Sequence, residues 1–148
     1  NVPVRGDGTI DSEERRIVEQ IGEWNAQNGE AIFGSRPWRV SGEGPTTLPS
    51  GLFGETTAKP FTGEDIRYTI NNGALYAMTL GPKSGDLSLA ALATNSATGA
   101  GEVTRVTMVG LDTTLDFSRD RNGLHVRLPD GSCHEFGAVL RIEGAGLN

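Results

Sequence analysis

Apolar side chains near the start of the chain have the spacing of an amphipathic helix. Ile17, Ile21 and Trp24 are joined by Val18, while charged and amide residues occupy the other sides. This i, i+4, i+7 spacing places the three apolar side chains on one helical face. The pattern predicts a helix over residues 12–28, whose apolar face must be buried against another part of a structure.

Both ends of this helix carry the expected signals. Asp11 or Ser12 can cap the N-terminus, and acidic residues fill the first turn. At the other end, Gly29 can take the left-handed conformation that ends a helix, and Gly34 permits a second bend. Pro37 prevents the helix from resuming. The sequence therefore predicts a joint after residue 28.

The second half of the chain shows short apolar segments separated by glycine-rich turns. Asn72-Gly73 is a typical two-residue hairpin turn, because both positions favour positive φ. No helical pattern that could join parallel strands follows the joint. We therefore expect a mainly β protein, an antiparallel β-sandwich preceded by one amphipathic α-helix. The predicted strands cover residues 66–70, 75–80, 87–92, 103–109, 115–118, 124–128 and 133–142.

Two strand regions allow finer predictions. Residues 75–80 have apolar side chains at both odd and even positions, which point to opposite faces of a strand, so this strand should be covered on both faces. Pro129-Asp130-Gly131 predicts a three-residue hairpin loop, which would place His125 opposite Glu135 on the exposed face. The same register predicts one shared core face for Leu124, Val126, Leu128, Phe136, Leu140 and Ile142.

Residues 40–62 have no apolar period and are rich in glycine, proline and threonine. This composition predicts a long loop, and such loops are uncommon within compact domains unless they are functional or disordered.

The charge pattern limits the possible partners. The formal net charge is −6, and the 13 lysine and arginine residues are scattered. We therefore expect no nucleic acid partner, and no membrane partner because no apolar segment is long enough to span a bilayer. Cys133 is the single cysteine, so an intrachain disulfide is impossible. We expect a soluble chain; periplasmic, secreted and cytoplasmic locations stay open.

The sequence offers few candidates for chemistry. His125 and His134, with Cys133 beside the latter, are better explained as structural or surface residues than as metal ligands, because the predicted register separates the histidines. The residues Asp116, Ser118, Asp120, Asn122 and Gly123 resemble the start of a calcium loop. Pro129 stands where that loop needs its glutamate, so a turn is the better interpretation.

Three residues near the joint are candidates for substrate binding. Arg36 and Trp38 combine a guanidinium with an indole, a pairing found both at domain interfaces and on sugar-binding surfaces. Glu43 is a further candidate for polar contacts. We expect an interface role for Arg36 and Trp38 ahead of a ligand role, and we expect no catalytic residue, no metal and no cofactor.

Several blocks of the chain resemble one enzyme family. Residues 28–38 and 42–45 are similar to the segment by which α-L-fucosidases of glycoside hydrolase family 29 pass from their catalytic barrel to a C-terminal β-sandwich. The resemblance extends over nearly the whole chain, and its further blocks are residues 1–3, 7–11, 21–24, 61–62, 65–67 and 75–77.

This resemblance implies a domain organisation. Residues 1–39 would be the end of the last strand, the last helix and the joint of a truncated (β/α)₈-like barrel. Residues 40–64 would be a linker, and residues 65–148 the C-terminal sandwich. In the family a catalytic aspartate and glutamate lie on the barrel and hydrolysis retains configuration. The resemblance therefore implies an accessory part that lacks both catalytic residues and is inactive alone.

Three kinds of partner remain open. The implied partner is the remainder of the fucosidase, while a second copy of the chain would make it an oligomerisation domain. A free-standing module that binds fucosylated glycans is the alternative of another class. In each case the helix carrying Ile17, Val18, Ile21 and Trp24 needs cover, because burying each such side chain is worth roughly 1.5–3 kcal/mol. We expect the helix either to fold back over residues 75–80 or to pair with its equivalent in a second copy.

Overall fold

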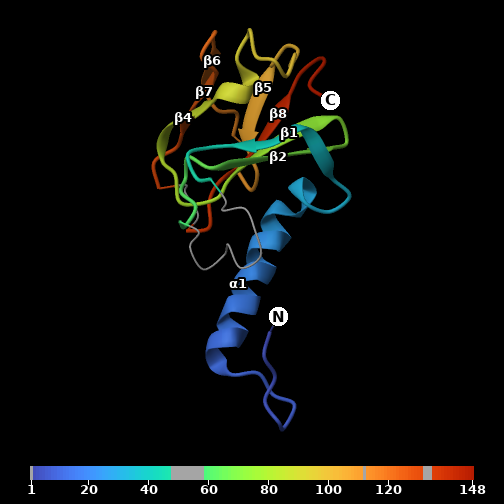
Figure 1. The fold of residues 1–148 in the computed structure, drawn as a ribbon, viewed down its shortest axis with the longest axis vertical. Helices are drawn as coiled ribbons and strands as arrows, with labels where there is room; N and C mark the ends of the chain where they lie inside the picture. Colours follow the sequence, from blue (N-terminus) through green and yellow to red (C-terminus); the bar gives the residue numbers. More distant parts are fainter. Residues whose placement is uncertain (1, 48–58, 112, 132–134) are drawn as a thin grey trace.

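The computed structural model describes residues 2–47, 59–111, 113–131 and 135–148. Two antiparallel sheets pack against each other, and a single α-helix, α1 (Ser12–Asn28), projects from them (Figure 1). The predicted fold class, an antiparallel β-sandwich preceded by one amphipathic helix, is confirmed. None of the helices among these residues has the length and apolar character needed to cross a bilayer.

Eight strands are present in the described residues. The five-stranded sheet has the order β1-β2-β3-β8-β5 and comprises β1 (Arg36–Glu43), β2 (Ile66–Asn71), β3 (Ala74–Thr79), β8 (Val139–Glu143) and β5 (Arg105–Met108). The three-stranded sheet has the order β4-β7-β6 and comprises β4 (Gly85–Leu89), β7 (Leu124–Leu128) and β6 (Phe117–Arg119). Two short 3₁₀ helices follow α1 and β4: η1 (Gly29–Ala31) and η3 (Ala90–Leu92).

The main core lies between the two sheets. Leu75 and Ala77 of β3 face the same cluster as Leu87 of β4 and Val126 of β7, and all four are almost fully buried. The alternation of buried and partly exposed residues along β2 follows from the two faces of a pleated strand. The Asn72-Gly73 turn between β2 and β3 has the predicted positive φ at both residues.

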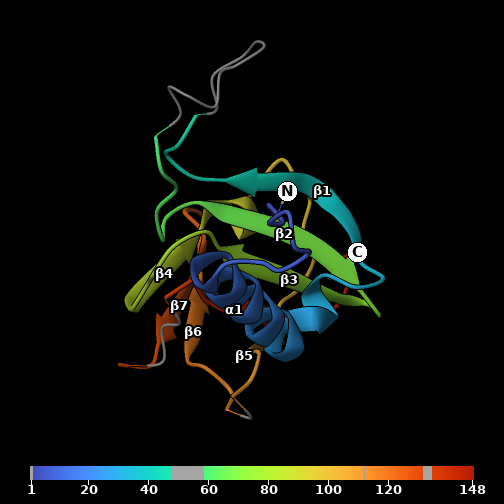
Figure 2. The same ribbon diagram turned by 90° about the horizontal axis from the view of Figure 1, so that it is seen from below.

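Strand β3 is buried on both faces, as its sequence predicts. Its other face contributes Ala74, Tyr76 and Met78 to a second cluster, against which Trp24 of α1 packs. The C-terminal end of α1 and η1 therefore cover the outer face of the five-stranded sheet (Figure 2). The helix covers β3 only with this end, so the expectation that the helix folds back is met in part.

The helix begins as predicted, but it ends differently. The carboxylate of Asp11 accepts a hydrogen bond from the Glu14 N–H at 3.0 Å. Gly29 keeps a right-handed conformation, with φ −57°, because its carbonyl accepts hydrogen bonds from Ile32 and Phe33 in the following 3₁₀ turn. The expectation of a left-handed Gly29 is therefore wrong, and the left-handed bend falls at Gly34, with φ 74°.

The predicted hairpin around Pro129-Asp130-Gly131 is also wrong. Strand β7 pairs with β4 and β6, whereas β8 pairs with β3 and β5, so the segment crosses from one sheet to the other. His125 lies opposite Ser88 and Ser118 and not opposite Glu135. The core positions on both strands are nonetheless buried as expected, except that Phe136 is 42% exposed. Period-two patterning fixes which face is buried but not which strand is the neighbour.

The predicted loop over residues 40–62 begins later than expected. Strand β1 continues to Glu43 and pairs with β2, with Gly42 opposite Arg67. Gly42 suggested a loop, but a Cβ at this position would lie only 2.2 Å from the Ile66 carbonyl oxygen, so the close pairing itself requires glycine. The domain division at residues 39 and 64 stays a prediction, and β1 runs across residue 39.

Candidate functional site

One candidate functional surface is the part of α1 that extends beyond the sandwich (Figure 1). Ile17, Val18 and Ile21 are 39%, 40% and 56% exposed, although all three belong to the apolar side of an amphipathic helix. Trp24, one turn further on, is partly buried because it reaches the cluster on the outer face of the five-stranded sheet. The apolar stripe of the helix is therefore covered at one end and open along the rest.

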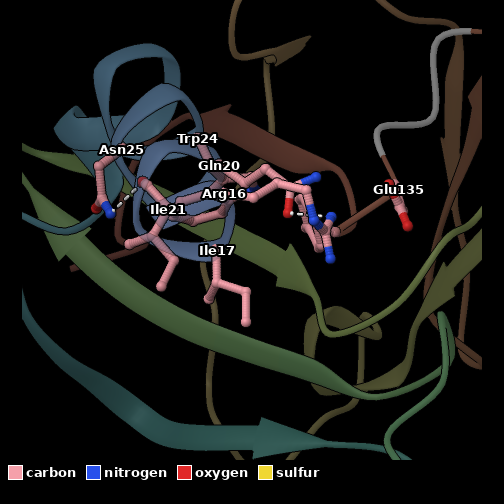
Figure 3. Close-up of a pocket in the computed structure, with 8 residues that line it drawn as sticks. Arg16, Ile17, Gln20, Ile21, Trp24, Asn25 and Glu135 are labelled. Atoms are coloured by element: carbon pink, nitrogen blue, oxygen red, sulfur yellow. Dashed lines mark hydrogen bonds between the residues drawn. The ribbon is translucent and has the colours of Figure 1, made fainter. Parts of the chain in front are cut away.

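A hollow of about 410 Å³ lies beside this stripe, between the helix and the segment that leads into β8. Figure 3 shows Ile17 and Ile21 projecting from the same side of the helix, with Glu135 on a separate segment. The hollow is lined by Arg16, Ile17, Gln20, Ile21, Trp24, Asn25, Glu135 and Phe136.

The polar groups around the hollow are of two kinds. Arg16 is held along the helix by Glu13, at 2.7 Å, and by the Gln20 amide oxygen, at 3.0 Å. The Glu13 hydrogen bond raises the pKa of Arg16, which stays charged. By contrast, the indole N–H of Trp24 is buried and has no hydrogen-bond partner within the described residues. A buried donor without a partner costs free energy.

The joint after α1 is fixed to the sandwich by polar contacts. The Asn71 amide donates hydrogen bonds to the carbonyls of Glu30 and Phe33, and the Thr69 hydroxyl donates to the Ala31 carbonyl at 2.7 Å. These bonds join η1 and the following turn directly to β2. The direction of α1 relative to the sheets is therefore set by the sandwich itself.

A cluster of charged groups lies next to this joint on the outer face of the five-stranded sheet. The Glu30 carboxylate accepts a hydrogen bond from the Tyr76 hydroxyl at 3.1 Å and pairs with Arg141 at 3.4 Å. Arg141 also pairs with Glu143 at 2.9 Å, and Glu143 pairs with Arg105. Burial, together with the Glu30 hydrogen bond, raises the pKa of Tyr76 to about 12, so the phenol stays protonated.

The three predicted substrate-binding candidates do not form a common site. Trp38 is only 5% exposed; it lies in the main core, its ring 5.1 Å from that of Tyr68, and its indole N–H donates to the Leu147 carbonyl. Glu43 accepts hydrogen bonds from the Tyr68 hydroxyl and the Ala91 N–H, at 2.8 and 2.7 Å. Arg36 is exposed at the start of β1.

The other sequence candidates divide between described and undescribed residues. Cys133 and His134 lie outside the described residues. The Asp120 carboxylate accepts hydrogen bonds from the N–H groups of Asn122 and Gly123, so the predicted turn is present there. In the described part of the chain, no three His, Cys, Asp or Glu side chains come together as a metal site would require. The sequence did not predict that Glu135 and Phe136 line the hollow beside α1. They are more than 100 residues from the helix in the sequence, and no local pattern indicates that they lie next to it.

With this geometry in view, the chain can be compared with known proteins. A family model described as the α-L-fucosidase C-terminal domain matches residues 59–143, which is more than half of the chain. The chain belongs to this family. The resemblance to α-L-fucosidases stated from the sequence is thereby confirmed, and the matched part of this fucosidase domain comprises β2 to β8.

Curated relatives of the fucosidase domain are much longer proteins. The chain is 32% identical over 131 residues to the tissue α-L-fucosidase of Homo sapiens, and the match covers 87% of this chain and 23% of that protein. It is 27% identical over 150 residues to the α-L-fucosidase of Branchiostoma floridae, covering 97% of this chain and 28% of that protein. The chain thus spans about a quarter of the length of these relatives.

Solved structures confirm the fold of the fucosidase domain. An α-fucosidase of Thermotoga maritima, in complex with a mechanism-based inhibitor, matches with a TM-score of 0.70 at 20% identity. The match covers 97% of this chain and 29% of that one, so it includes α1 as well as the sandwich. A Paenibacillus thiaminolyticus α-L-fucosidase isoenzyme matches with a TM-score of 0.62 at 21% identity, over 97% of this chain and 29% of that one.

Proposed function

We propose that this chain is the C-terminal accessory part of a retaining α-L-fucosidase, and that it supports the catalytic domain without carrying out the chemistry. Membership of the C-terminal domain family supports this assignment, as does the greater length of the fucosidase relatives. The observation that carries it is the open apolar stripe of α1. The spacing of Ile17, Val18 and Ile21 places them on one apolar face, which is typical of a buried surface, yet the sandwich leaves them exposed.

The occupant that fits this stripe is the remainder of the same polypeptide. The joint at the end of the helix is hydrogen-bonded to β2, so the open face of the helix extends away from the sandwich for docking. Burying side chains of this kind is worth roughly 1.5–3 kcal/mol each, which is large compared with the stability of a typical domain. The hollow beside the stripe offers a docking segment a concave surface next to the exposed apolar side chains.

Three carboxylates of this chain have structural hydrogen-bond partners. A retaining glycosidase needs two carboxyl groups about 5–5.5 Å apart, one as nucleophile and one as acid and base. Glu43 and Glu30 instead accept hydrogen bonds from tyrosine hydroxyls, and Asp65 is enclosed by four hydrogen bonds. We assign the catalytic pair to the remainder of the fucosidase. The chain alone should therefore not hydrolyse an aryl fucoside.

The test uses the full-length polypeptide that contains these 148 residues. Ile21→Asp places a charge on the open stripe and should lower both the melting temperature and the turnover of an aryl fucoside. The matched control is Ala97→Asp, at an exposed position in the loop between β4 and β5, which should change neither. Equal behaviour of the two variants would contradict the docking of α1.

The isolated chain supplies a second measurement. Measurable turnover of an aryl fucoside by the purified chain would overturn the accessory role. Light scattering would detect a dimer, and loss of that dimer in Ile21→Asp would assign the stripe to a second copy instead of the catalytic domain.

A further inference from the structure

The exposed face of the three-stranded sheet carries an ordered set of polar side chains. Strands β4, β7 and β6 lie side by side, and every second residue points away from the core. Cross-strand pairing arranges these residues in two rows: Ser88, His125 and Ser118 in the first, and Asp86, Arg127 and Asp116 in the second. From strand spacing and rise, the set measures roughly 10 by 7 Å.

His125 is held by hydrogen bonds before any ligand arrives, whereas Arg127 and Asp86 form a largely exposed ion pair. The two ring nitrogens of His125 are hydrogen-bonded to the Ser88 hydroxyl, at 2.8 Å, and to the Asp120 carboxylate, at 3.0 Å. The His125 hydrogen bond lowers the pKa of Asp120, so this carboxylate stays ionised. Arg127 is paired with Asp86 at 2.9 Å. Groups that are already ordered lose less conformational entropy on binding.

The surface is hollowed because its side chains are short. The hollow has a volume of about 550 Å³, and serine on either side of His125 leaves room above the sheet. Phe117 and Val126 also border it, but both pack into the core. The hollow therefore presents hydroxyl, carboxylate, imidazole and guanidinium groups together with about as much apolar surface.

The charges in this hollow select a class of ligand. Asp86 and Asp116 flank Arg127, and the Asp116 carboxylate makes no hydrogen bond or ion pair within the described residues. Two carboxylates beside one guanidinium disfavour an anionic ligand. An apolar ligand would leave these polar groups unpaired, which costs free energy. A neutral molecule with many hydroxyl groups, which both donate and accept, can satisfy donors and acceptors together.

The position of the hollow keeps it accessible. The three-stranded sheet packs on one face of the five-stranded sheet, while α1 and η1 pack on the opposite face. Docking on the open helix stripe therefore does not by itself cover this surface. The inference does not depend on the proposed supporting role, because the two surfaces lie on opposite sides of the sandwich.

We propose that the outer face of the three-stranded sheet is a binding surface for a neutral oligosaccharide. Arg127 donates to sugar hydroxyls, and the Asp116 carboxylate accepts from them. Ser88, Ser118 and His125 hold the neighbouring hydroxyls. No aromatic side chain projects from either row, so the affinity should be modest, with a Kd on the order of 1 mM.

The test is a titration of the ¹⁵N-labelled chain with lactose, maltose and fucosyllactose in separate NMR experiments. At least one sugar should shift the amide resonances of β4, β7 and β6 and leave those of α1 unchanged. Arg127→Ala should weaken the binding at least tenfold. The matched control Arg121→Ala removes an exposed arginine from the turn between β6 and β7 and should bind as the unchanged chain does.

A second variant guards against loss of structure. Ser88→Leu fills the hollow without removing a charge and should also abolish the shifts, while the remaining spectrum shows an intact fold. The inference is overturned if none of the three sugars shifts these resonances at concentrations of roughly 10 mM. It is equally overturned if Arg127→Ala binds as tightly as Arg121→Ala.

Discussion

Trp38 provides a direct test of the difference between a core residue and a ligand-binding residue. Its side chain is 5% exposed, its ring packs on Tyr68, and its indole N–H donates to the Leu147 carbonyl. Trp38→Ala removes the ring and leaves a cavity between the sheets. Substitutions of this kind cost about 3–5 kcal/mol in unfolding free energy.

A milder change separates the two contributions. Trp38→Phe keeps an aromatic ring in the core but leaves the Leu147 carbonyl without its donor, which should cost about 1–3 kcal/mol. Arg36→Ala, at an exposed position on the same strand, is the control and should change the free energy by less than about 0.5 kcal/mol.

Urea unfolding of the isolated chain, followed by circular dichroism, measures all three variants. A loss below about 1 kcal/mol for Trp38→Ala would show that the indole is not packed in the core, and the reasoning from burial would fail. Indole fluorescence supplies an independent check. If added fucose quenched the indole fluorescence of the unchanged chain but not that of Trp38→Ala, Trp38 would contact the ligand. That result would favour the ligand role that the sequence left open for this residue.

Two further predictions concern acid stability and the helix. Asp65 accepts four hydrogen bonds from Thr46 and Thr62, which outweigh the effect of burial and lower its pKa from 3.8 to about 2. Its stabilising contribution is complete above pH 3.8 and is lost as the pH falls towards 2, so Asp65→Asn should flatten the pH dependence of urea unfolding in that range. Gly22 lies within α1, and a Cβ there would meet no atom within 4 Å. Gly22→Ala should therefore stabilise the isolated chain by about 0.5–1 kcal/mol, and a calorimetric loss instead would show that the helix is not formed there.

The sequence by itself determined the local elements of this protein. The helix over residues 12–28, the Asn72-Gly73 turn and the two buried faces of β3 all follow from spacing and from backbone preferences. The sequence left the helix cap open between Asp11 and Ser12, and the structure assigns it to Asp11. These features depend on residues close together in the chain, where a period of 3.6 or 2 is sufficient information. The family resemblance added the fucosidase assignment, which the family match confirms.

The tertiary structure decided which elements are neighbours. The same alternating pattern allows β7 to pair with β8 or with β4 and β6, and the choice depends on packing between segments far apart in the sequence. The role of Gly42 could not be deduced from its sequence neighbours either. The atom that excludes a side chain at this position is the Ile66 carbonyl oxygen, which belongs to β2. For Trp38 the sequence suggested a domain interface or a ligand, whereas the structure places it in the main core.

The two proposed surfaces show the same division between local pattern and tertiary structure. The amphipathic spacing of α1 predicts an apolar face, but only the docking of its last turn shows that Trp24 is covered while Ile17 and Ile21 stay open. The polar rows on the three-stranded sheet combine residues 86–88, 116–118 and 125–127, which no linear motif connects. Side chains from three separate strands come together only when the sheet forms, because strand order depends on packing between segments far apart in the sequence.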